Sequence, residues 1–424
     1  VIRRQRQMCI RDRFKDQIKN NIIYLKQKNP RQILSNLSSQ IFKKKPQNLI
    51  AVTGTNGKTS IANFYYQILK KNKKKVASFG TLGISGKKKI ENTSNTTFDP
   101  IKIGKNLNYL EKKKINNVIL EASSHGLKQH RLDGLKFDVG IFTNLSRDHL
   151  DYHKTLKDYL NAKLILFKKL MKKGSFAIFD EDIKYAKILK NICKKNKIKK
   201  FTIGELNGDL LIEKYSIVDN KQELTFSFNK KKYNLKTQLI GKIQIKNLLM
   251  SILAAHKSNI KLDNILKSVE NIKAVPGRFE EIGNFKNNSI AILDYAHTPD
   301  ALKTCVLNIK EQFKHRKVNL VFGCGGDRDK PKRSIMGKIA NDLCDKIYLT
   351  DDNPRTESPK KIRNNIKAKI LKSKLVEIPS RKKAIEKAIK DLRSDEILIV
   401  AGKGHENYQE YKTCLLYTSD AADE

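Results

Sequence analysis

The chain has 424 residues, a formal net charge of +44 and 39% hydrophobic residues. Such a length and apolar content predict a globular protein with two or three domains that each have a real core. No segment approaches the ~20 consecutive apolar residues that a membrane span requires, and no secretory signal pattern is present. A membrane span is therefore not expected.

The positive charge comes mostly from lysines that are scattered along the whole chain, together with many Asn and Ile residues. This texture favours a general residue bias over a nucleic-acid-binding face, so nucleic acid is not an expected partner. A polyanionic substrate would still benefit from the field. The six cysteines form no CxxC pair, which indicates neither a zinc site nor a disulfide framework. Reduced thiols fit a cytoplasmic location.

The two ends of the chain, 1–13 and 413–424, lack the Lys/Asn/Ile texture of the rest. Both resemble translated sequencing-adapter sequence, and we expect each to be an artefact or a disordered tail. Residues 14–48 contain one expected helix, at 30–43, and are too short for an independent domain. They are predicted to be the remnant of a larger N-terminal domain that is mostly missing.

The most informative motif is Thr-Gly-Thr-Asn-Gly-Lys-Thr-Ser at 53–60, between an apolar run at 49–52 and a helical pattern from Ile61. A Gly-rich turn between a strand and a helix lets backbone N–H groups surround phosphate oxygens at the helix N-terminus. Lys58 would reach the β- and γ-phosphates, and the Thr59 hydroxyl would help to hold Mg²⁺. The motif predicts an ATP-binding loop, although the general pattern has glycine where Val52 stands.

Strand-like apolar runs alternate with helical segments on both sides of a Pro-Gly hinge at 275–279. This alternation predicts the α/β class. We expect a central P-loop ATPase domain at 49–275 with a mainly parallel sheet, followed by a Rossmann-like C-terminal domain at 276–412. Ligands of such sheets bind at the carboxyl ends of the strands. The expected strands lie at 49–52, 76–79, 118–121, 139–143, 290–293, 318–322, 346–349 and 397–400.

Polar residues follow these strands where a metal and phosphate site would form. Glu121 closes a strand opposite the phosphate loop, where nucleotide-bound Mg²⁺ prefers an oxygen ligand. The segment 144–153 supplies an amide, carboxylates and imidazoles. Lys163 lies on an otherwise apolar face of a helix expected at 154–170. A buried amine needs a partner or must change its charge.

Six motifs together resemble the Mur ligase family of peptidoglycan synthesis, in the family's order and over about 29–411. Within that family the chain is most similar to ligases that extend UDP-N-acetylmuramoyl-L-alanyl-D-glutamate. The motifs lie at 53–60, 121–131, 144–153, 294–300, 325–330 and 401–406.

The resemblance implies a bacterial, cytoplasmic, monomeric ATP-dependent amide ligase with ATP and Mg²⁺ as cofactors. It would phosphorylate the D-Glu side-chain carboxylate of the UDP-N-acetylmuramoyl dipeptide and join the acyl phosphate to the amine of meso-2,6-diaminopimelate. A lysine-adding or folylpolyglutamate-type ligase is the nearer alternative, and a nucleic-acid-associated P-loop ATPase is the remote one. Without most of the N-terminal domain, we expect weak binding of the UDP-sugar.

The resemblance also assigns roles to residues. The catalytic residues would be Lys58, Glu121, His149 and Lys163. The metal ligands would be Thr59, Glu121 and His149, and Lys163 would be carbamylated to N6-carboxylysine. ATP would contact Gly54, Thr55, Asn56, Gly57, Lys58, Thr59, Ser60, Asn144, Arg278, Asp294 and His297. The UDP-muramoyl substrate would contact Asn95, Thr96, Thr97, Ser123, Gln129 and Arg131. Diaminopimelate would contact Arg328, Asp352, Asn353, Pro354, Arg355, Gly402 and Glu406.

The choice of diaminopimelate follows from charge. The distal end of this amino acid carries both a carboxylate and an ammonium group. The Arg355 guanidinium supplies a planar fork for the carboxylate, and Glu406 can pair with the amine. Lysine as substrate would leave the arginine unpaired, which costs binding energy.

Overall fold

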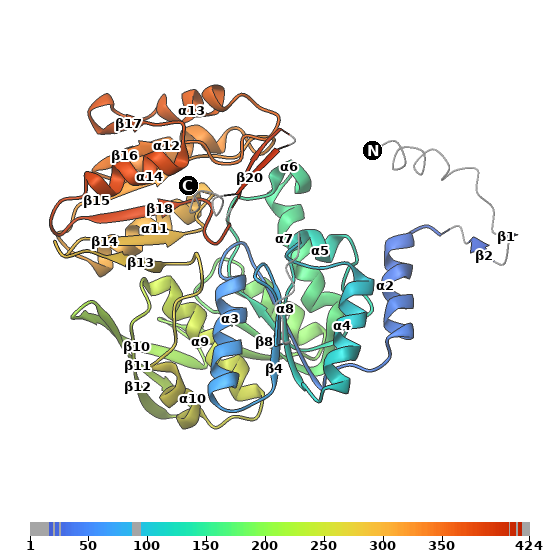
Figure 1. Ribbon diagram of the computed structural model, residues 1–424. Helices are drawn as coiled ribbons and strands as arrows, with labels where there is room; N and C mark the ends of the chain where they lie inside the picture. The colour runs from blue at the N-terminus through green and yellow to red at the C-terminus, as the bar shows by residue number, and fades with distance from the viewer. Residues whose placement is uncertain are drawn as a thin grey trace.

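The computed structural model describes residues 17–19, 22–24, 27–86, 95–406, 408–412 and 414–417. The expected artefact at 1–13 lies outside these residues, and so does most of the one at 413–424. Two sheets, each covered by helices, lie one above the other, with the larger sheet below in the view of Figure 1. The expected α/β class with two successive sheets is confirmed.

The larger sheet has ten strands in the order β12-β11-β10-β9-β8-β7-β3-β6-β4-β5. Neighbours from β10 to β4 are parallel, and antiparallel pairs close the sheet at both ends. The strands are β3 (Asn48–Thr53), β4 (Val76–Gly80), β5 (Gly83–Ser85), β6 (Asn117–Glu121), β7 (Phe137–Phe142), β8 (Met171–Asp180), β9 (Lys199–Gly204), β10 (Leu210–Val218), β11 (Lys221–Phe228) and β12 (Lys231–Thr237).

Helices bury both faces of this sheet, which explains why its central strands are continuously apolar. One core lies under α3 (Lys58–Lys71), α9 (Lys242–Lys257) and α10 (Leu262–Val269). The core on the other face lies under α4, α5, α7, the π-helical turn η1 and α8. These elements are α4 (Pro100–Lys112), α5 (Ser124–Lys128), α7 (Leu156–Ile165), η1 (Leu166–Leu170) and α8 (Ala186–Lys195).

Strand β3 lies between β6 and β7, although the chain leaves β3 through α3 toward β4. The order of the strands therefore reverses beside β3, and a crevice opens at its carboxyl end. The phosphate loop occupies that crevice. Gly54 and Gly57 both have positive φ, and a Cβ at Gly57 would lie 2.6 Å from the Asn247 side-chain oxygen. Glycine at 57 thus lets α3 begin directly against α9.

The helix expected at 154–170 is confirmed over 156–170. It is preceded by the short α6 (Leu150–His153) and consists of α7 followed by η1. Lys154 has a φ of +63°, which ends α6. The Thr155 hydroxyl then accepts a hydrogen bond from Asp158 N at 3.1 Å and caps a new helix. Helical periodicity alone does not show such a break.

The second sheet has six strands in the order β13-β14-β18-β15-β16-β17, parallel except for the β13–β14 pair. Helices α11, α12 and α13 cover one face and α14 covers the other. The elements are β13 (Glu280–Asn284), β14 (Ile290–Asp294), α11 (Pro299–Gln312), β15 (Val318–Phe322), α12 (Lys332–Leu343), β16 (Lys346–Leu349), α13 (Pro359–Lys367), η2 (Lys372–Lys374), β17 (Leu375–Glu377), α14 (Arg381–Lys390) and β18 (Ile397–Ala401).

Three smaller pieces complete the described chain. The hairpin β1 (Gln17–Lys19) and β2 (Ile22–Tyr24) precedes α2 (Pro30–Ile41), which packs on α4. At the other end β19 (Tyr408–Tyr411) pairs with β20 (Cys414–Tyr417). Part of the tail expected to be disordered at 413–424 is therefore a strand. No helix in the described ranges is both apolar and long enough to cross a membrane.

Replacing Leu248 by Ala should destabilise the protein, because this α9 side chain is fully buried between the sheet and α3. Large-to-small changes in such cores cost about 2–5 kcal/mol of unfolding free energy. Urea denaturation followed by circular dichroism measures the loss. Leu307→Ala is the matched control, since Leu307 lies on α11 and is 42% exposed. Equal losses in the two variants would contradict the assigned core.

Candidate active site

The loop after β7 holds the phosphate loop in shape. Asn144 accepts a hydrogen bond from Asn56 N through its side-chain oxygen at 2.9 Å, and from Thr55 N through its carbonyl at 3.0 Å. A Cβ at Gly54 would collide with the Thr143 hydroxyl, 1.7 Å away. The two strand ends are therefore fitted to one another, and these contacts help to define the conformation of the loop.

Lys58 lies at the start of α3, and its ammonium group donates to the carbonyls of Gly54 (2.9 Å) and Thr55 (2.8 Å). Burial lowers the pKa of Lys58, while the charges of Glu121 and Asp148 oppose that shift. The ammonium thus has internal partners in this structure. It is also close enough to two carboxylates to be influenced by both.

Glu121 ends β6 and is 2% exposed. Its carboxylate accepts hydrogen bonds from the hydroxyl of Thr59 (3.0 Å) and from the N–H (2.9 Å) and hydroxyl (3.2 Å) of Thr81. Burial raises the pKa of Glu121, and the nearby Lys58 charge opposes the rise. The Thr59 and Glu121 oxygens are hard donors placed beside a phosphate loop, so this pair fits Mg²⁺.

His149 has a left-handed backbone conformation with a φ of +52°. Burial lowers the pKa of His149 to about 3, which keeps its ring neutral at physiological pH. Its Nε2 lies 3.3 Å from the Asp148 carboxylate, and the Lys58 charge also lowers its pKa. The structure therefore brings His149 into the same electrostatic cluster as the predicted residues Lys58 and Glu121.

Lys163 on α7 is 1% exposed, as its apolar helix face predicts. Its amine donates to the Gly54 carbonyl at 2.6 Å and lies 4.3 Å from the centre of the Tyr159 ring. Burial, reinforced by the charge of Lys58, lowers the pKa of Lys163 well below its usual value. The amine faces the phosphate loop and is poised to be neutral.

A cavity of about 310 Å³ opens beside the phosphate loop, between the two sheets. Arg278 lines it, stacked 4.0 Å from the centre of the Tyr295 ring, and its buried Nε has no hydrogen-bond partner. Asp294 accepts hydrogen bonds from the backbone N–H groups of Phe279 and Ala296, each at 2.9 Å. The residues predicted for ATP that line this cavity are Asn56, Gly57, Ser60, Asn144, Arg278, Asp294 and His297.

A second cavity of about 590 Å³ extends from Lys58 to the strand ends of the smaller sheet. His297 lines both cavities. The predicted residues around the second cavity, besides Lys58 and His149, are Asn95, Thr96, Thr97, Ser123, Gln129, Arg131, Arg328, Asp352, Asn353, Arg355, Gly402 and Glu406. Pro354 does not line it, and its carbonyl accepts a hydrogen bond from Glu357 N at 3.1 Å.

Two groups of residues line opposite sides of this second cavity. On the larger sheet's side, the Thr97 hydroxyl donates to the Glu121 carbonyl at 2.8 Å, and Arg131 donates to the Thr97 carbonyl. On the smaller sheet's side, Lys403 donates to Asn353 (2.8 Å) and Glu406 (3.1 Å). Substrate contacts predicted separately from sequence thus share one space.

Arg355 has a φ of +50° and lies 2.9 Å from the Glu410 carboxylate. It also donates to the Gly326 carbonyl at 2.9 Å. Arg328 is 55% exposed and lies 4.0 Å from Asp151 of the larger sheet's side. Arg147 and Asp329 make a reciprocal ion pair at 3.5 Å. The arginine of one pair and the carboxylate of the other come from the larger sheet's side, so two ion pairs connect the two sides of the cavity.

Several residues around the cavities were not assigned a role from sequence. Tyr295 stacks on Arg278 and donates to Glu406 at 3.2 Å, which links the two cavities. The sequence feature that could have identified Tyr295 is its position in the Asp-Tyr-Ala-His motif at 294–297. Asn247 on α9 also lines the cavity beside the phosphate loop. The others are His125, Arg147, Asp148, Asp151, Gln244, Asp329 and Lys332.

Comparisons with known proteins agree with this architecture. The family description "Mur ligase middle domain" matches residues 52–255, and "Mur ligase, glutamate ligase domain" matches residues 277–404. The chain belongs to the Mur ligase family. A protein of Rickettsia montanensis named UDP-N-acetylmuramoyl-L-alanyl-D-glutamate–2,6-diaminopimelate ligase is 41% identical to it over 95% of this chain and 84% of the relative.

A relative of the same name from Chelativorans sp. (strain BNC1) is 38% identical over 92% of this chain and 80% of its own length. A solved structure with that name shares 32% identity, covers 92% of this chain and 80% of its own, and has a TM-score of 0.65. A Mycobacterium tuberculosis folylpolyglutamate synthase complexed with ADP has a TM-score of 0.73 at 14% identity, over 94% and 95% of the two chains. The last likeness concerns the fold alone.

Glu357→Gln should destabilise the wall of the cavity of about 590 Å³. Glu357 accepts two hydrogen bonds from the buried Arg333, at 2.8 and 3.0 Å, and these hold its pKa at about 2. Because this pKa lies below its usual value of 4.5, the stabilisation is present above about pH 5 and is lost as the pH falls toward 2. Removing the charge should cost about 2 kcal/mol of unfolding free energy at pH 7.

Urea denaturation at pH 7 and at pH 3.5 measures this loss. The variant should show less acid destabilisation than the parent chain. Asp342→Asn provides the control, because Asp342 makes an exposed pair with Lys338 and its removal should leave the unfolding free energy almost unchanged. An unchanged unfolding free energy in Glu357→Gln would contradict the role of this pair.

Proposed function

We propose that the chain is an ATP-dependent ligase that joins meso-2,6-diaminopimelate to UDP-N-acetylmuramoyl-L-alanyl-D-glutamate in the bacterial cytoplasm. One observation carries the proposal: a single cavity runs from the phosphate-loop lysine Lys58 to the charged cluster of Asp352, Arg355 and Glu406. A phosphoryl donor, an acceptor carboxylate and an incoming amine can therefore meet in one enclosed space. The names of the relatives support the same reaction.

In the first step the D-Glu carboxylate oxygen attacks the γ-phosphorus of ATP. A new P–O bond forms as the bond to the β-phosphate oxygen breaks, and ADP leaves. Phosphoryl transfer depends mainly on positioning and charge neutralisation. Lys58 and Arg278 supply positive charge from two sides, and Asn144 fixes the loop that holds the phosphates. Mg²⁺, when bound by Thr59, Glu121 and His149, would neutralise phosphate charge.

In the second step the amine nitrogen attacks the carbonyl carbon of the acyl phosphate, and the tetrahedral intermediate releases phosphate. Arg355 and Arg328 would bind the distal carboxylate of diaminopimelate, and Glu406 with Asp352 would face its ammonium group. Glu406 is held by Lys403 and Tyr295, so its carboxylate is fixed in the cavity wall. The assignment of these residues to the substrates is a prediction, as is a monomeric state.

The test is phosphate release from ATP in the presence of the UDP-muramoyl dipeptide and either diaminopimelate or lysine. We expect release to require the dipeptide and to be much faster with diaminopimelate. In Arg355→Ala, kcat/KM for diaminopimelate should fall by roughly 10- to 100-fold, with little change for lysine. Arg393→Ala, an exposed arginine away from the cavity, is the control.

Equal use of lysine by the parent chain would favour the lysine-adding alternative. Phosphate release without the muramoyl dipeptide but with folate and glutamate would favour a folylpolyglutamate-type ligase. DNA-stimulated ATP hydrolysis would favour the remote alternative.

Lys163→Ala should reduce turnover by roughly 100-fold or more, with partial rescue by a short carboxylate such as acetate. A neutral amine can form an N–C bond with CO₂, and burial disfavours the protonated form of Lys163. The resulting carbamate would place a carboxylate beside the phosphate loop. Lys157→Ala is the matched control, since Lys157 is exposed on the same helix. Full turnover of Lys163→Ala would contradict the carbamate.

A further inference from the structure

A third cavity lies at the amino ends of the central parallel strands, opposite to the phosphate loop. It has a volume of about 670 Å³ and lies around the amino ends of β3, β6, β7 and β8. Strand β3 runs from Asn48 in this cavity to Thr53 beside the phosphate loop. Five steps along the strand at ~3.3 Å each separate the two places by roughly 17 Å. A ligand here would not be in the reaction centre.

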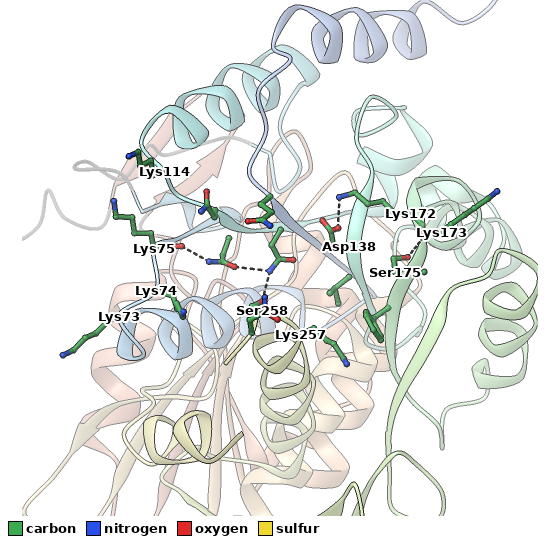
Figure 2. Close-up of a pocket in the computed structure, with 18 residues that line it drawn as sticks. Lys73, Lys74, Lys75, Lys114, Asp138, Lys172, Lys173, Ser175, Lys257 and Ser258 are labelled. Atoms are coloured by element: carbon green, nitrogen blue, oxygen red, sulfur yellow. Dashed lines mark hydrogen bonds and ion pairs between the residues drawn. The ribbon is translucent and has the colours of Figure 1, made fainter. Parts of the chain in front are cut away.

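Seven lysines and one carboxylate line this cavity, which we name the lysine basin. Figure 2 shows Lys73, Lys74, Lys75 and Lys114 along one side and Lys172 and Lys173 along the other. The seventh lysine is Lys257, and the carboxylate is Asp138. Seven ammonium groups against one carboxylate leave a formal charge of +6 around a single hollow.

Asp138 offsets little of this charge. One of its oxygens lies 2.7 Å from the Lys172 ammonium, and the other accepts a hydrogen bond from Leu49 N at 3.0 Å. Among the described residues, no carboxylate lies within ion-pair distance of the other six lysines. Elsewhere, Lys232 and Lys236 on β12 and Lys246 on α9 each lie within ion-pair distance of a carboxylate.

Helix dipoles explain only part of the arrangement. The C-termini of α3, α4 and α9 lie at the same side as the amino ends of these strands, and lysines commonly complement the C-termini of helices. Each helix end is equivalent to about −0.5 charge, so three ends offset only about a quarter of +6. A general excess of lysine explains unpaired lysines, but it does not explain their collection around one hollow.

The surroundings of Lys257 show that the protein does not neutralise the positive charge of the basin. Its ammonium lies 4.1 Å from the centre of the Phe176 ring and 4.2 Å from that of Phe201. Burial lowers the pKa of Lys257, and the charge of Lys199 lowers it further. An anion in the basin would favour the protonated form.

The floor of the basin is polar and internally satisfied. The Asn48 amide donates to Asn117 (3.1 Å) and Ser258 (2.8 Å), and Asn117 donates to the Lys75 carbonyl (3.1 Å). A ligand would therefore be held by the ammonium groups of the rim. Phe176 is covered by Lys257 and by Lys199, whose ammonium lies 5.7 Å from its ring centre. Phe176, the one aromatic residue among those that line the basin, is thus already in contact with two ammonium groups.

We propose that the lysine basin binds a compact multivalent phosphate anion of the short-polyphosphate class. A concave rim of point charges suits a small anion of high charge density, whereas base recognition needs stacking surfaces or forked donors. Binding by ammonium groups alone is electrostatic, so its affinity falls steeply with added salt. The proposed binding of phosphate in the lysine basin does not depend on the proposed ligase reaction.

The experiment is calorimetric titration of the full chain with inorganic tripolyphosphate in the presence of saturating ADP, which keeps the phosphate loop occupied. The test variant is Lys74→Gln/Lys75→Gln/Lys173→Gln, and the control is Lys231→Gln/Lys382→Gln/Lys383→Gln. Both remove three exposed lysines, so the net charge of the chain changes equally. Thermal unfolding confirms that both variants remain folded, and ATP turnover should be unchanged in both.

We expect one tripolyphosphate site in the parent chain, weakened about tenfold in the test variant and less than twofold in the control. Each exposed ion pair contributes a factor of roughly two to three, so three give about ten. Equal weakening in both variants, or no binding in the presence of ADP, would overturn the proposal. Binding of single-stranded nucleic acid or of acidic lipid vesicles that tripolyphosphate fails to displace would also overturn it.

Discussion

The active site depends on charges that are buried behind the phosphate loop with incomplete compensation. Lys163 and Glu121 are almost removed from water, and Lys58 is half-buried. Burial lowers the pKa of the two amines and raises the pKa of the carboxyl group, so each ionised form is held at a cost. Triphosphate oxygens, a divalent cation and a lysine carbamate would each complete the set. The protein supplies the two amines and the carboxylate, and the ligands would supply the charges that compensate them.

The position of this network follows from the topology of the two sheets. Residues that follow the carboxyl ends of parallel strands in both sheets line the same cavity. The pair formed by Arg278 and Tyr295 bridges that space, because Tyr295 contacts Arg278 through its ring and Glu406 through its hydroxyl. A nucleotide on one side and an amino acid on the other would therefore contact one continuous set of side chains.

Much of this arrangement could be predicted from the sequence, since strand ends marked by polar motifs converge in any parallel α/β sheet. Residues 49–52, 118–121 and 318–322 were correctly expected to be strands. The helix over 156–170 was expected to within two residues, whereas the short α6 before it was not, because a capping hydroxyl and one positive φ separate the two helices. The ion pairs of Arg147 and Arg328 join residues about 180 positions apart and have no local signal.

The hydrogen bonds of Lys58 to Gly54 and Thr55 have a consequence for how the loop meets its ligand. Two carbonyl oxygens already occupy the ammonium group in the way that phosphate oxygens would. The carbonyl oxygens of Gly54 and Thr55 therefore take the places around the ammonium group that phosphate oxygens would take. A triphosphate that binds replaces these carbonyl oxygens with its own. Its affinity reflects the difference between the two sets, so the free loop stays ordered without binding the nucleotide too tightly to release it.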